Sequence, residues 1–388
     1  MNKIDPDGSW RATEHNFSYP ENVMIESALQ KYLRENGLSK AEQDLFLKVR
    51  RHPEQNNLVL FCYNQIDSPK SNPVVISARG HILDSSNDWA HVARPFDRFF
   101  NDGEGCADSL NFGESVCYTK EDGSLISLWF YNGRWNVSTK GSPNAGGYVY
   151  NYNAADNNLT FEGLFWDVWN KLGYKLPEDT SKTYVFELCT KWNRVVVPHP
   201  TDRIVLLCVR HNLSGVEDNP NLYSNLWEVA KSHNLFSLQD IKDTFANIPA
   251  LHNEGHVVAQ YLPCGKVKRV KVKHPGYLAI SHLKEGINKR RLLELKRSGE
   301  DGEFLSMFPE YSEQFLEIDV AYESFHNDLA VLWSRVKDIS DQKEFALAIK
   351  GIRGSNYLFA VRKNNETLRS VLSKCNIDAL MGAIGLSQ

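Results

Sequence analysis

A lysine that directly precedes a predicted strand is the residue of this chain whose setting points most clearly to chemistry. Lys120 opens the segment KEDGS at 120–124, and a run of apolar residues follows from Leu125 to Tyr131. A lysine amine presented in this way can attack the α-phosphate of a nucleotide and form a phosphoramidate. The pattern K-x-D-G is short, however, and taken alone it is better explained as an exposed turn lysine.

A second candidate is a predicted hairpin that combines one carboxylate with two ammonium groups. Glu254 directly precedes the predicted strand His256–Leu262, and a turn leads from there into Val267–Lys273. Lys271 and Lys273 are two residues apart and therefore share one face of their strand. A carboxylate and two ammoniums on one sheet face suit a metal-bound triphosphate. A solvated strand edge with alternating charge explains the pattern about as well.

The register of this hairpin decides which residues share a face. With the turn centred near residues 264–265, Lys273 lies opposite His256 and Lys271 lies opposite Val258. Residues 254, 256 and 258 share parity, so Glu254 is predicted on the face of both lysines. A slip of one residue would reverse this assignment.

The remaining candidates are single charged residues in or beside predicted strands. Glu187 lies inside an apolar segment, where a carboxylate is costly unless it has a partner; it could accept ribose hydroxyls, hold water on a metal, or point to solvent. Lys140 follows a predicted strand at the same open end as Lys120. Arg79 and Arg98 could each clamp a phosphate, although singly each is better explained as an ordinary surface arginine.

Short runs of β-branched and aromatic residues bounded by turn residues predict the strands that carry these groups. The predicted strands are Leu58–Tyr63, Val74–Ala78, Leu125–Tyr131, Tyr184–Leu188, Arg194–Val197, Ile204–Val209, His256–Leu262 and Val267–Lys273. Asn132-Gly133 predicts a type I′ hairpin between Leu125–Tyr131 and Arg134–Thr139. The apolar spacing of Phe161–Leu172 predicts one helix among these strands.

The distribution of these patterns predicts two domains and a terminal arm. Residues 1–21 are polar and are predicted to be a loose arm, and 22–52 are predicted to be helical. A β-rich domain covers 22–283, and a helical domain covers 284–388, with a loop at 298–303. The predicted helices of the second domain are Asn288–Arg297, Tyr311–Val336, Gln342–Ile349 and Thr367–Cys375. The predicted fold class is therefore α+β.

Composition limits the classes of protein. The chain of 388 residues has 44 Lys and Arg, 48 Asp and Glu and a net charge of −4, which excludes a globally basic nucleic-acid coat. Residues 266–297 still contain eleven Lys or Arg against two acids. This block could follow a phosphate backbone or be a solvated basic helix. The seven cysteines are scattered and form no C-x-x-C pair, which argues against a disulfide framework and a structural zinc site.

The order of the candidate motifs resembles that of the covalent nucleotidyltransferase superfamily, and specifically the bacteriophage T4 RNA ligase 1 family. The resemblance covers roughly residues 57–283 and includes segments outside the catalytic motifs, such as LFCYN at 60–64 and NRVVV at 193–197. It implies an antiparallel β-rich nucleotidyltransferase domain of the ATP-grasp-like ligase type, followed by an all-helical C-terminal domain. The C-terminal third resembles the family only in being helical.

The resemblance also implies a role for each candidate residue. Lys120 is the adenylylated nucleophile, Glu187 and Glu254 serve ribose and metal binding, and Asp122 joins them as a metal ligand. The implied nucleotide and phosphate contacts are Arg79, Arg98, Phe100, Gly123, Lys140, Lys271 and Lys273. At Arg98 the family pattern prefers lysine, and arginine there changes the donor geometry.

The function implied is that of an ATP-dependent RNA ligase with Mg²⁺ or Mn²⁺ as its divalent ion. Lys120 takes AMP from ATP, the AMP passes to an RNA 5′-phosphate, and a 3′-hydroxyl displaces AMP to seal the strand. We expect Lys140, Lys271, Lys273 and a bound Mg²⁺ to lower the pKa of Lys120. Cleaved tRNA is the substrate suggested by family analogy. With no secretory signal and no apolar run long enough to span a membrane, we expect a cytoplasmic monomer with no membrane partner, in the host cytoplasm if the source is viral.

Three other functions share part of this pattern. A GTP-dependent RNA capping guanylyltransferase and an ATP-dependent DNA ligase use the same lysine chemistry, but both add an OB-fold, which in the capping enzymes carries an R-x-D-K motif. This chain has no R-x-D-K, and its tail is predicted to be helical. A catalytically decayed RNA-end-binding protein is expected to have lost a charged motif residue, and none is missing.

Overall fold

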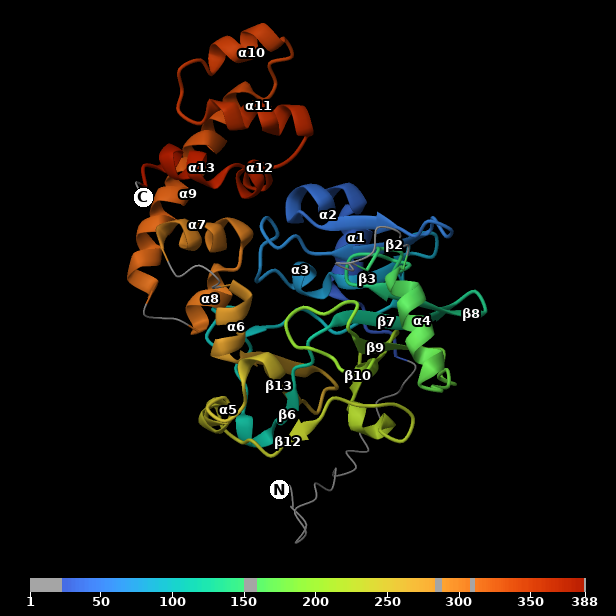
Figure 1. The fold of residues 1–388 in the computed structure, drawn as a ribbon. Coiled ribbons are helices and arrows are strands. Elements are labelled where there is room, and N and C mark those ends of the chain that lie inside the picture. Colours follow the sequence, from blue (N-terminus) through green and yellow to red (C-terminus); the bar gives the residue numbers. More distant parts are fainter. Residues whose placement is uncertain (1–22, 150–158, 283–287, 308–310, 387–388) are drawn as a thin grey trace.

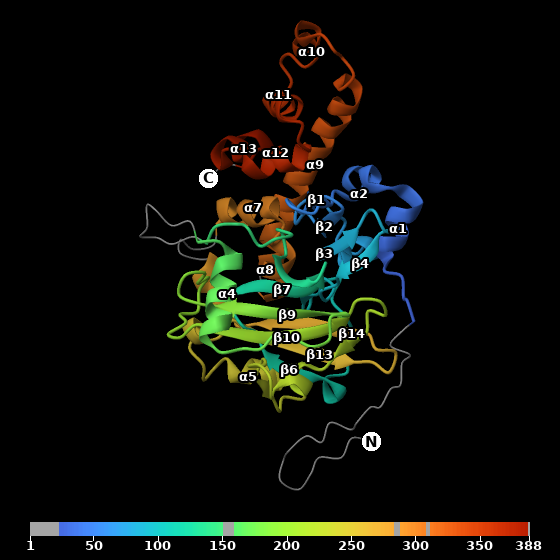
Figure 2. The ribbon, with the colours of Figure 1, turned by 90° about the vertical axis from the view of Figure 1, so that its right-hand side faces the viewer.

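The computed structural model describes residues 23–149, 159–282, 288–307 and 311–386. Its fold is α+β, as predicted: three sheets come first along the chain, and the elements that follow Lys273 in the described residues are helices (Figures 1 and 2). All strand pairs are antiparallel except β5 with β14 and one isolated bridge. The predicted arm at 1–21 and the boundary predicted at 283/284 lie outside the described residues.

The first sheet has the order β1-β2-β3-β4 and is covered by helices on one side. Its strands are Lys48–Arg51, Leu58–Cys62, Arg79–Asp84 and Ala90–Ala93. Helix α1 (Ala28–Asn36) buries Leu29 and Leu33 against it, and helix α2 (Leu38–Leu45) buries Ala41 and Leu45. The helix predicted over 22–52 is wrong at its end, because Phe46 adopts a left-handed φ of 52° that stops α2. The chain then turns into β1.

A second correction concerns Val74–Ala78, which the sequence predicted as a strand. This segment forms helix α3 (Pro73–Ser77). The side chain of Asn72 accepts a hydrogen bond from the Val74 N–H, and Pro73 fixes φ in the first turn. These two capping features favour a helix start and override the β propensity of the valines.

The second sheet has the order β11-β10-β9-β7-β8 and carries one helix on its face. The strands are Ser124–Tyr131 (β7), Arg134–Thr139 (β8), Lys182–Cys189 (β9), Arg203–His211 (β10) and Glu217–Asp218 (β11). Asn132 and Gly133 have φ of 49° and 78°, which confirms the predicted hairpin turn. Helix α4 (Phe161–Lys171) buries Phe165 and Trp169 against the sheet, as predicted.

Residues 194–197 were also predicted to be a strand, and they are not one. The backbone N–H groups of Val196 and Val197 instead donate to the Asp122 carboxylate at 2.9 and 2.6 Å. A segment whose amides bind a side chain has no free edge to offer a neighbouring strand.

The third sheet has the order β12-β6-β13-β14-β5. Its strands are Phe100–Asn101 (β5), Val116–Thr119 (β6), Ser232–His233 (β12), Gly255–Tyr261 (β13) and Val267–Lys273 (β14), with helix α5 (Leu238–Thr244) beside it. The β13–β14 register is one residue from the prediction, because Lys273 lies opposite Gly255 and not His256. Lys271 correspondingly lies opposite Val257.

The C-terminal helices have a buried core of their own. They are α6 (Pro275–His282), α7 (Lys289–Ser298), α8 (Asp301–Met307), α9 (Ser312–Val336), α10 (Gln342–Ala348), α11 (Ser355–Asn364), α12 (Leu368–Lys374) and α13 (Ile377–Ile384). The loop predicted over 298–303 is shorter than expected, since α8 begins at Asp301. One hydrophobic cluster runs from Leu292 to Leu386 through α9 and α12. Among the residues described, no helix is long and apolar enough to cross a membrane.

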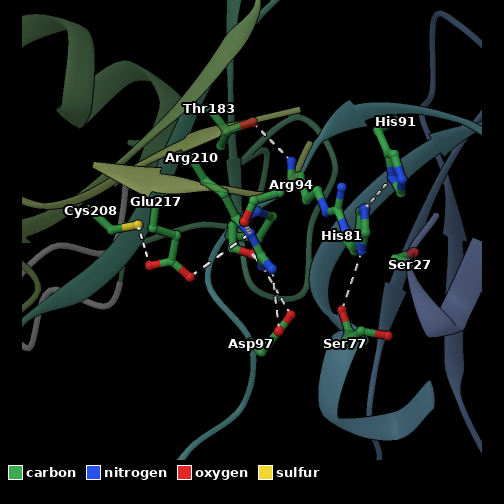
Figure 3. A network of polar contacts seen from close by, with 12 residues as sticks. Ser27, Ser77, His81, His91, Arg94, Asp97, Thr183, Cys208, Arg210 and Glu217 are labelled. Atoms are coloured by element: carbon green, nitrogen blue, oxygen red, sulfur yellow. Dashed lines mark hydrogen bonds and ion pairs between the residues drawn. The ribbon is translucent and has the colours of Figure 1, made fainter. Parts of the chain in front are cut away.

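A buried polar network joins the second sheet to the third and to the segment that follows β4; Figure 3 shows the part around Arg210, Asp97 and Glu217. Glu217 accepts from Arg269 at 2.5 Å, lies 3.8 Å from Arg210, and accepts from the Cys208 thiol at 3.1 Å. Arg210 also bonds Asp97 at 3.0 Å and so fixes the segment that follows β4. Removal of one partner from a buried pair leaves an unpaired charge, which costs far more than loss of a surface pair.

We therefore expect Glu217→Ala to lower the free energy of unfolding by about 3–5 kcal/mol, because the buried Arg269 guanidinium loses its counter-ion and Arg210 keeps only Asp97. The measurement is urea denaturation followed by circular dichroism. The matched control is Glu54→Ala, which removes an exposed pair with Arg134 at 2.8 Å and should cost much less, because water screens exposed pairs. Equal losses in the two variants would show that the network does not have this structural role.

Candidate active site

A cavity of about 180 Å³ lies between the second and third sheets and gathers five of the candidate residues: Arg79, Lys120, Glu187, Lys271 and Lys273. Arg79 comes from the start of β3, Glu187 from β9, and the two later lysines from β14. Lys120 occupies the crossing from β6 to β7, which belong to different sheets. The crossing therefore places the Lys120 amine where both sheets contribute side chains.

Lys120 and Lys273 share one carboxylate. The Nζ atom of Lys120 donates to Glu254 Oε2 at 2.6 Å, and Lys273 Nζ lies 3.4 Å from Glu254 Oε1. Glu254 is buried, and the two ammonium groups are only slightly exposed. An anion held between two cations in a shielded site interacts more strongly than an exposed pair.

A glycine explains why Glu254 reaches the lysines although the register differs from the prediction. Strict alternation in the observed register puts residues 255 and 257 on the lysine face and residue 254 on the other. Gly255 has a φ of 139°, and a Cβ there would lie 2.3 Å from the Val272 carbonyl oxygen. Only glycine accepts this backbone, which departs from the regular strand just beside Glu254.

Gly123 allows a second close approach. A Cβ on this residue would meet the Leu188 carbonyl oxygen at 2.3 Å. Gly123 therefore lets the start of β7 lie against β9, the strand that carries Glu187. It does not line the cavity itself.

The pKa of Lys120 moves in the direction opposite to the prediction. Burial lowers it, but the nearby carboxylates of Glu254 and Glu187 raise it more, so that it lies above its ordinary value. The expectation that neighbouring lysines lower this pKa is wrong for this structure, because carboxylates are the nearest charges. Lys140 is also not close to the amine; its Nζ lies over the Tyr63 ring, 4.9 Å from the centroid.

Two other groups in the cavity are shifted by burial. Burial raises the pKa of Glu187 to about 8, with Lys120 opposing the shift. Burial lowers the pKa of Lys271 to about 7, and the charges of Lys120 and Arg79 add to that effect. Shifts of this kind, in groups that face one cavity, are typical of catalytic and binding sites.

Asp122 is held by protein donors. Its Oδ2 atom accepts from the amides of Val196 and Val197, and its Oδ1 atom accepts from the Tyr277 hydroxyl at 2.9 Å. Asp122 does not line the cavity. This geometry gives the carboxylate a positioning role next to Lys120, and it does not support the metal-ligand role expected from the sequence.

Arg98, Phe100 and Lys140 form a separate group outside the cavity. The Arg98 guanidinium lies 3.9 Å from the Tyr63 ring centroid and 5.0 Å from that of Phe100. Lys140 contacts the same tyrosine. These residues are brought together with one another, but the structure does not place them on the cavity wall.

The aromatic residues that do line the cavity were missed. Phe96 and Phe99 belong to the segment between β4 and β5, and the Arg79 guanidinium lies 4.5 Å from the Phe96 ring centroid. Lys271 Nζ lies 5.0 Å from the Phe99 ring centroid. The sequence run RPFDRFF at 94–100 contains both residues, but nothing in the run shows which phenylalanine faces inward.

The basic block at 266–297 is largely neutralised at its C-terminal end. On α7, Lys289 pairs with Glu317 at 2.7 Å, Arg291 with Glu294 at 2.9 Å, and Lys296 with both Asp319 and Glu323. Arg290 pairs with Asp378 at 3.2 Å. These contacts hold α7 to its neighbouring helices, so α7 does not form the free phosphate-binding stripe that the sequence suggested.

The pKa of Glu187 generates a stability prediction. A carboxyl whose pKa is higher in the folded protein binds a proton on folding, so the stability present at low pH is lost as pH rises toward the folded value. We expect Glu187→Gln to become more stable than the wild type, by about 1 kcal/mol or more, as pH rises from 5 to 8.5. The measurement is chemical denaturation at each pH.

Glu313→Gln is the control for that experiment, since it removes the same charge from an exposed side chain. It should show no such pH-dependent gain. A constant difference between Glu187→Gln and the wild type across the pH range would mean that Glu187 is not held in an unfavourable charged state.

Comparison with known proteins finds a family model and two relatives whose names all include RNA ligase. A family model described as RNA ligase matches residues 77–277, just over half of the chain. An RNA ligase of Rhodothermus phage RM378 is 25% identical over 363 residues, covering 75% of this chain and 82% of the phage protein. A protein of Autographa californica nuclear polyhedrosis virus, named as a bifunctional polynucleotide kinase/RNA ligase, is 29% identical over 322 residues. That alignment covers 76% of this chain but only 44% of the viral protein.

Solved structures show a looser likeness. An archaeal ATP-dependent RNA ligase has a TM-score of 0.43 at 10% identity, over 74% of this chain and 82% of that one. A Naegleria gruberi RNA ligase mutant with ATP and Mn has a TM-score of 0.30 at 12% identity, over 44% of this chain and 52% of that one.

Proposed function

The chain belongs to the RNA ligase family whose model matches residues 77–277, and we propose that it is an ATP-dependent RNA ligase acting through a lysyl-AMP on Lys120. The observation that carries this proposal is the position of the Lys120 amine, which lies in a cavity with Glu187, Lys271 and Lys273 and donates to the buried carboxylate of Glu254. Transfer of a nucleotidyl group depends mainly on positioning and on neutralising phosphate charge. This set of side chains provides both.

In the first step, the Lys120 amine attacks the α-phosphorus of ATP. The bond from Nζ to phosphorus forms, the bond to the bridging oxygen breaks, and pyrophosphate leaves with the electron pair. Glu254, 2.6 Å from Nζ, is placed to orient the amine and to take its proton. Because the pKa of Lys120 is raised, this deprotonation is a necessary part of catalysis.

The cations of the cavity serve the phosphates in this proposal. Lys271 and Lys273 lie on the face of β14 that lines the cavity. They contact the α-phosphate and the leaving pyrophosphate, and Arg79, at the start of β3, contacts the triphosphate. Arg98, Phe100 and Lys140 remain predicted nucleotide contacts from outside the cavity. Gly123 acts by letting β7 approach β9.

The donor set fits a magnesium or manganese ion. Mg²⁺ is usually held by one or two carboxylates together with substrate phosphates and water, and Glu187 and Glu254 supply two carboxylates near the amine. The residues described contain no group of three or more His, Cys, Asp or Glu able to hold an ion, so the nucleotide would complete the site. When bound, the ion neutralises phosphate charge.

The later steps use the same amine as a leaving group. The RNA 5′-phosphate attacks the lysyl-AMP, the bond from nitrogen to phosphorus breaks, and a pyrophosphate-linked RNA adenylate forms. A 3′-hydroxyl then attacks the 5′-phosphate, AMP leaves, and a phosphodiester joins the ends. Repair of cleaved tRNA is the biological setting we propose for this reaction.

The tail of the chain favours this proposal over the alternatives. A capping enzyme or a DNA ligase would follow the nucleotidyltransferase part with an OB-fold, whereas the described residues after Lys273 are helical and contain no strand. A decayed end-binding protein would not need to keep Lys120, Glu254 and Lys273 in mutual contact.

Incubation with α-³²P-labelled ATP and Mg²⁺, followed by denaturing electrophoresis, tests the covalent step. Label should remain on the wild-type protein and be lost in Lys120→Ala, because no other amine occupies that position. Lys242→Ala, at an exposed lysine on α5, should label like the wild type. Labelling from GTP in place of ATP would indicate a capping enzyme.

The low pKa of Lys271 predicts proton uptake when ATP binds. At pH 8 an amine with a pKa of about 7 is mostly neutral, and a nearby triphosphate raises that pKa and draws in a proton. We expect uptake of about 0.5 proton or more per ATP. Calorimetry in EDTA, in buffers of different ionisation enthalpy, measures it.

Lys271→Arg is the informative variant for this experiment, since arginine stays charged at this pH. It should bind ATP with much less proton uptake than the wild type. Identical uptake in the two proteins would place the titrating group elsewhere.

A further inference from the structure

We propose that Glu303, on helix α8 of the C-terminal segment, occupies part of the position in the active site where the ATP phosphates would bind. Glu303 must therefore be displaced when ATP binds. This inference rests on the proposed ATP-dependent function and adds a competing group to the same site. Glu303 was not among the residues that the sequence singled out. Its place was predicted to be a loop.

The direct contact is an ion pair between Glu303 and Lys273. Lys273 also bonds Glu254, so its ammonium lies between one carboxylate of the catalytic sheet and one from α8. Lys273 is a proposed contact of the α-phosphate. A carboxylate on this ammonium occupies one of the donors that a phosphate oxygen would use.

The field around Glu303 is that of the whole lysine cluster. Burial would raise its pKa, but Lys273, Lys271 and Lys120 together hold the pKa of this carboxyl below its ordinary value. Glu303 therefore carries its negative charge at a point where the side chains of three lysines converge. The same convergence of positive charge is what would attract a triphosphate.

Helix α8 is held in position from two sides. Phe304, the neighbour of Glu303, is buried in the core of the C-terminal helices. Just before the helix, the Gly299 carbonyl accepts from Gln65 and Lys70, each at 3.2 Å. Ser306 lies against Gly103, whose Cβ would be 3.5 Å from that of the serine. These contacts present Glu303 to the site as part of an ordered element.

The space available agrees with competition. The cavity measures about 180 Å³ and is lined by Lys273 but by no described residue of α8, whereas sites for small-molecule ligands usually enclose about 300–1,000 Å³. A triphosphate therefore requires both more room and the release of Lys273 from Glu303. Because α8 also belongs to the helical core, ATP binding should move the C-terminal segment relative to the sheets.

The test is Glu303→Gln, which keeps the shape of the side chain and removes its charge. If Glu303 competes with phosphate, the competent state becomes more populated and the apparent Kd for ATP falls in proportion. We expect ATP, measured in EDTA by calorimetry, to bind at least threefold more tightly, with no change for adenosine. Glu313→Gln changes the net charge equally at an exposed site and should bind both ligands like the wild type.

Unchanged or weaker ATP binding in folded Glu303→Gln would overturn the inference, and weaker binding would indicate that Glu303 helps to bind the nucleotide. Failure of the wild type to form labelled lysyl-AMP would instead count against the proposed function.

A reversible tether provides a second test in case Glu303→Gln does not fold. Gly103→Cys with Ser306→Cys, in a Cys106→Ser background, places two cysteines at a Cβ separation suited to a disulfide and would hold α8 against the site. Oxidation should weaken ATP binding at least threefold, and dithiothreitol should restore it. Equal affinity in the two redox states would contradict the inference, and any strain at Gly103 (φ 85°) is common to both states.

Discussion

The ion pairs of Glu254 with Lys120 and Lys273 are the constraint on which the rest of the site depends. A buried ammonium is costly unless a carboxylate accompanies it, and Glu254 accompanies two of them. The same contact that makes the site stable keeps the Lys120 amine protonated, because it raises the pKa. In the proposed mechanism, incoming phosphate charge and the loss of a proton must therefore rearrange a contact that folding favours.

Two glycines allow the backbone to take the path that this contact requires. Lys120 and Glu254 lie in loops at the ends of strands, and their side chains meet only because the strands approach unusually closely there. Gly255 lies close to the neighbouring strand β14 in a backbone conformation that only glycine adopts, and Gly123 lets β7 lie against β9. The buried network around Glu217 then fixes the segment that carries the aromatic wall. The sheets and these two glycines thus position the Lys120 amine.

The C-terminal helices contribute to the site as well as to the remainder of the fold. Their basic helix α7 uses its charges mainly to bind acidic neighbours, so RNA recognition by simple charge along α7 is not supported. Glu303 of α8 forms an ion pair with Lys273, one of the lysines that line the cavity. Helix α8 contacts both the core of the C-terminal helices and the proposed nucleotide site. Binding of a nucleotide should therefore change the position of these helices.

The sequence by itself determined the order and chemistry of the charged motifs, the α+β class, the Asn132-Gly133 hairpin and the family resemblance, because these depend on local patterns and on spacing along the chain. It did not determine which residues face the cavity. Glu254 reaches the lysine face of β14 because of the Gly255 backbone, and the inward Phe96 and Phe99 depend on packing between sheets. The role of Asp122 depends on Val196, Val197 and Tyr277, which are distant in sequence. Only tertiary structure could decide these points, because charge and burial are set by partners that local sequence does not specify.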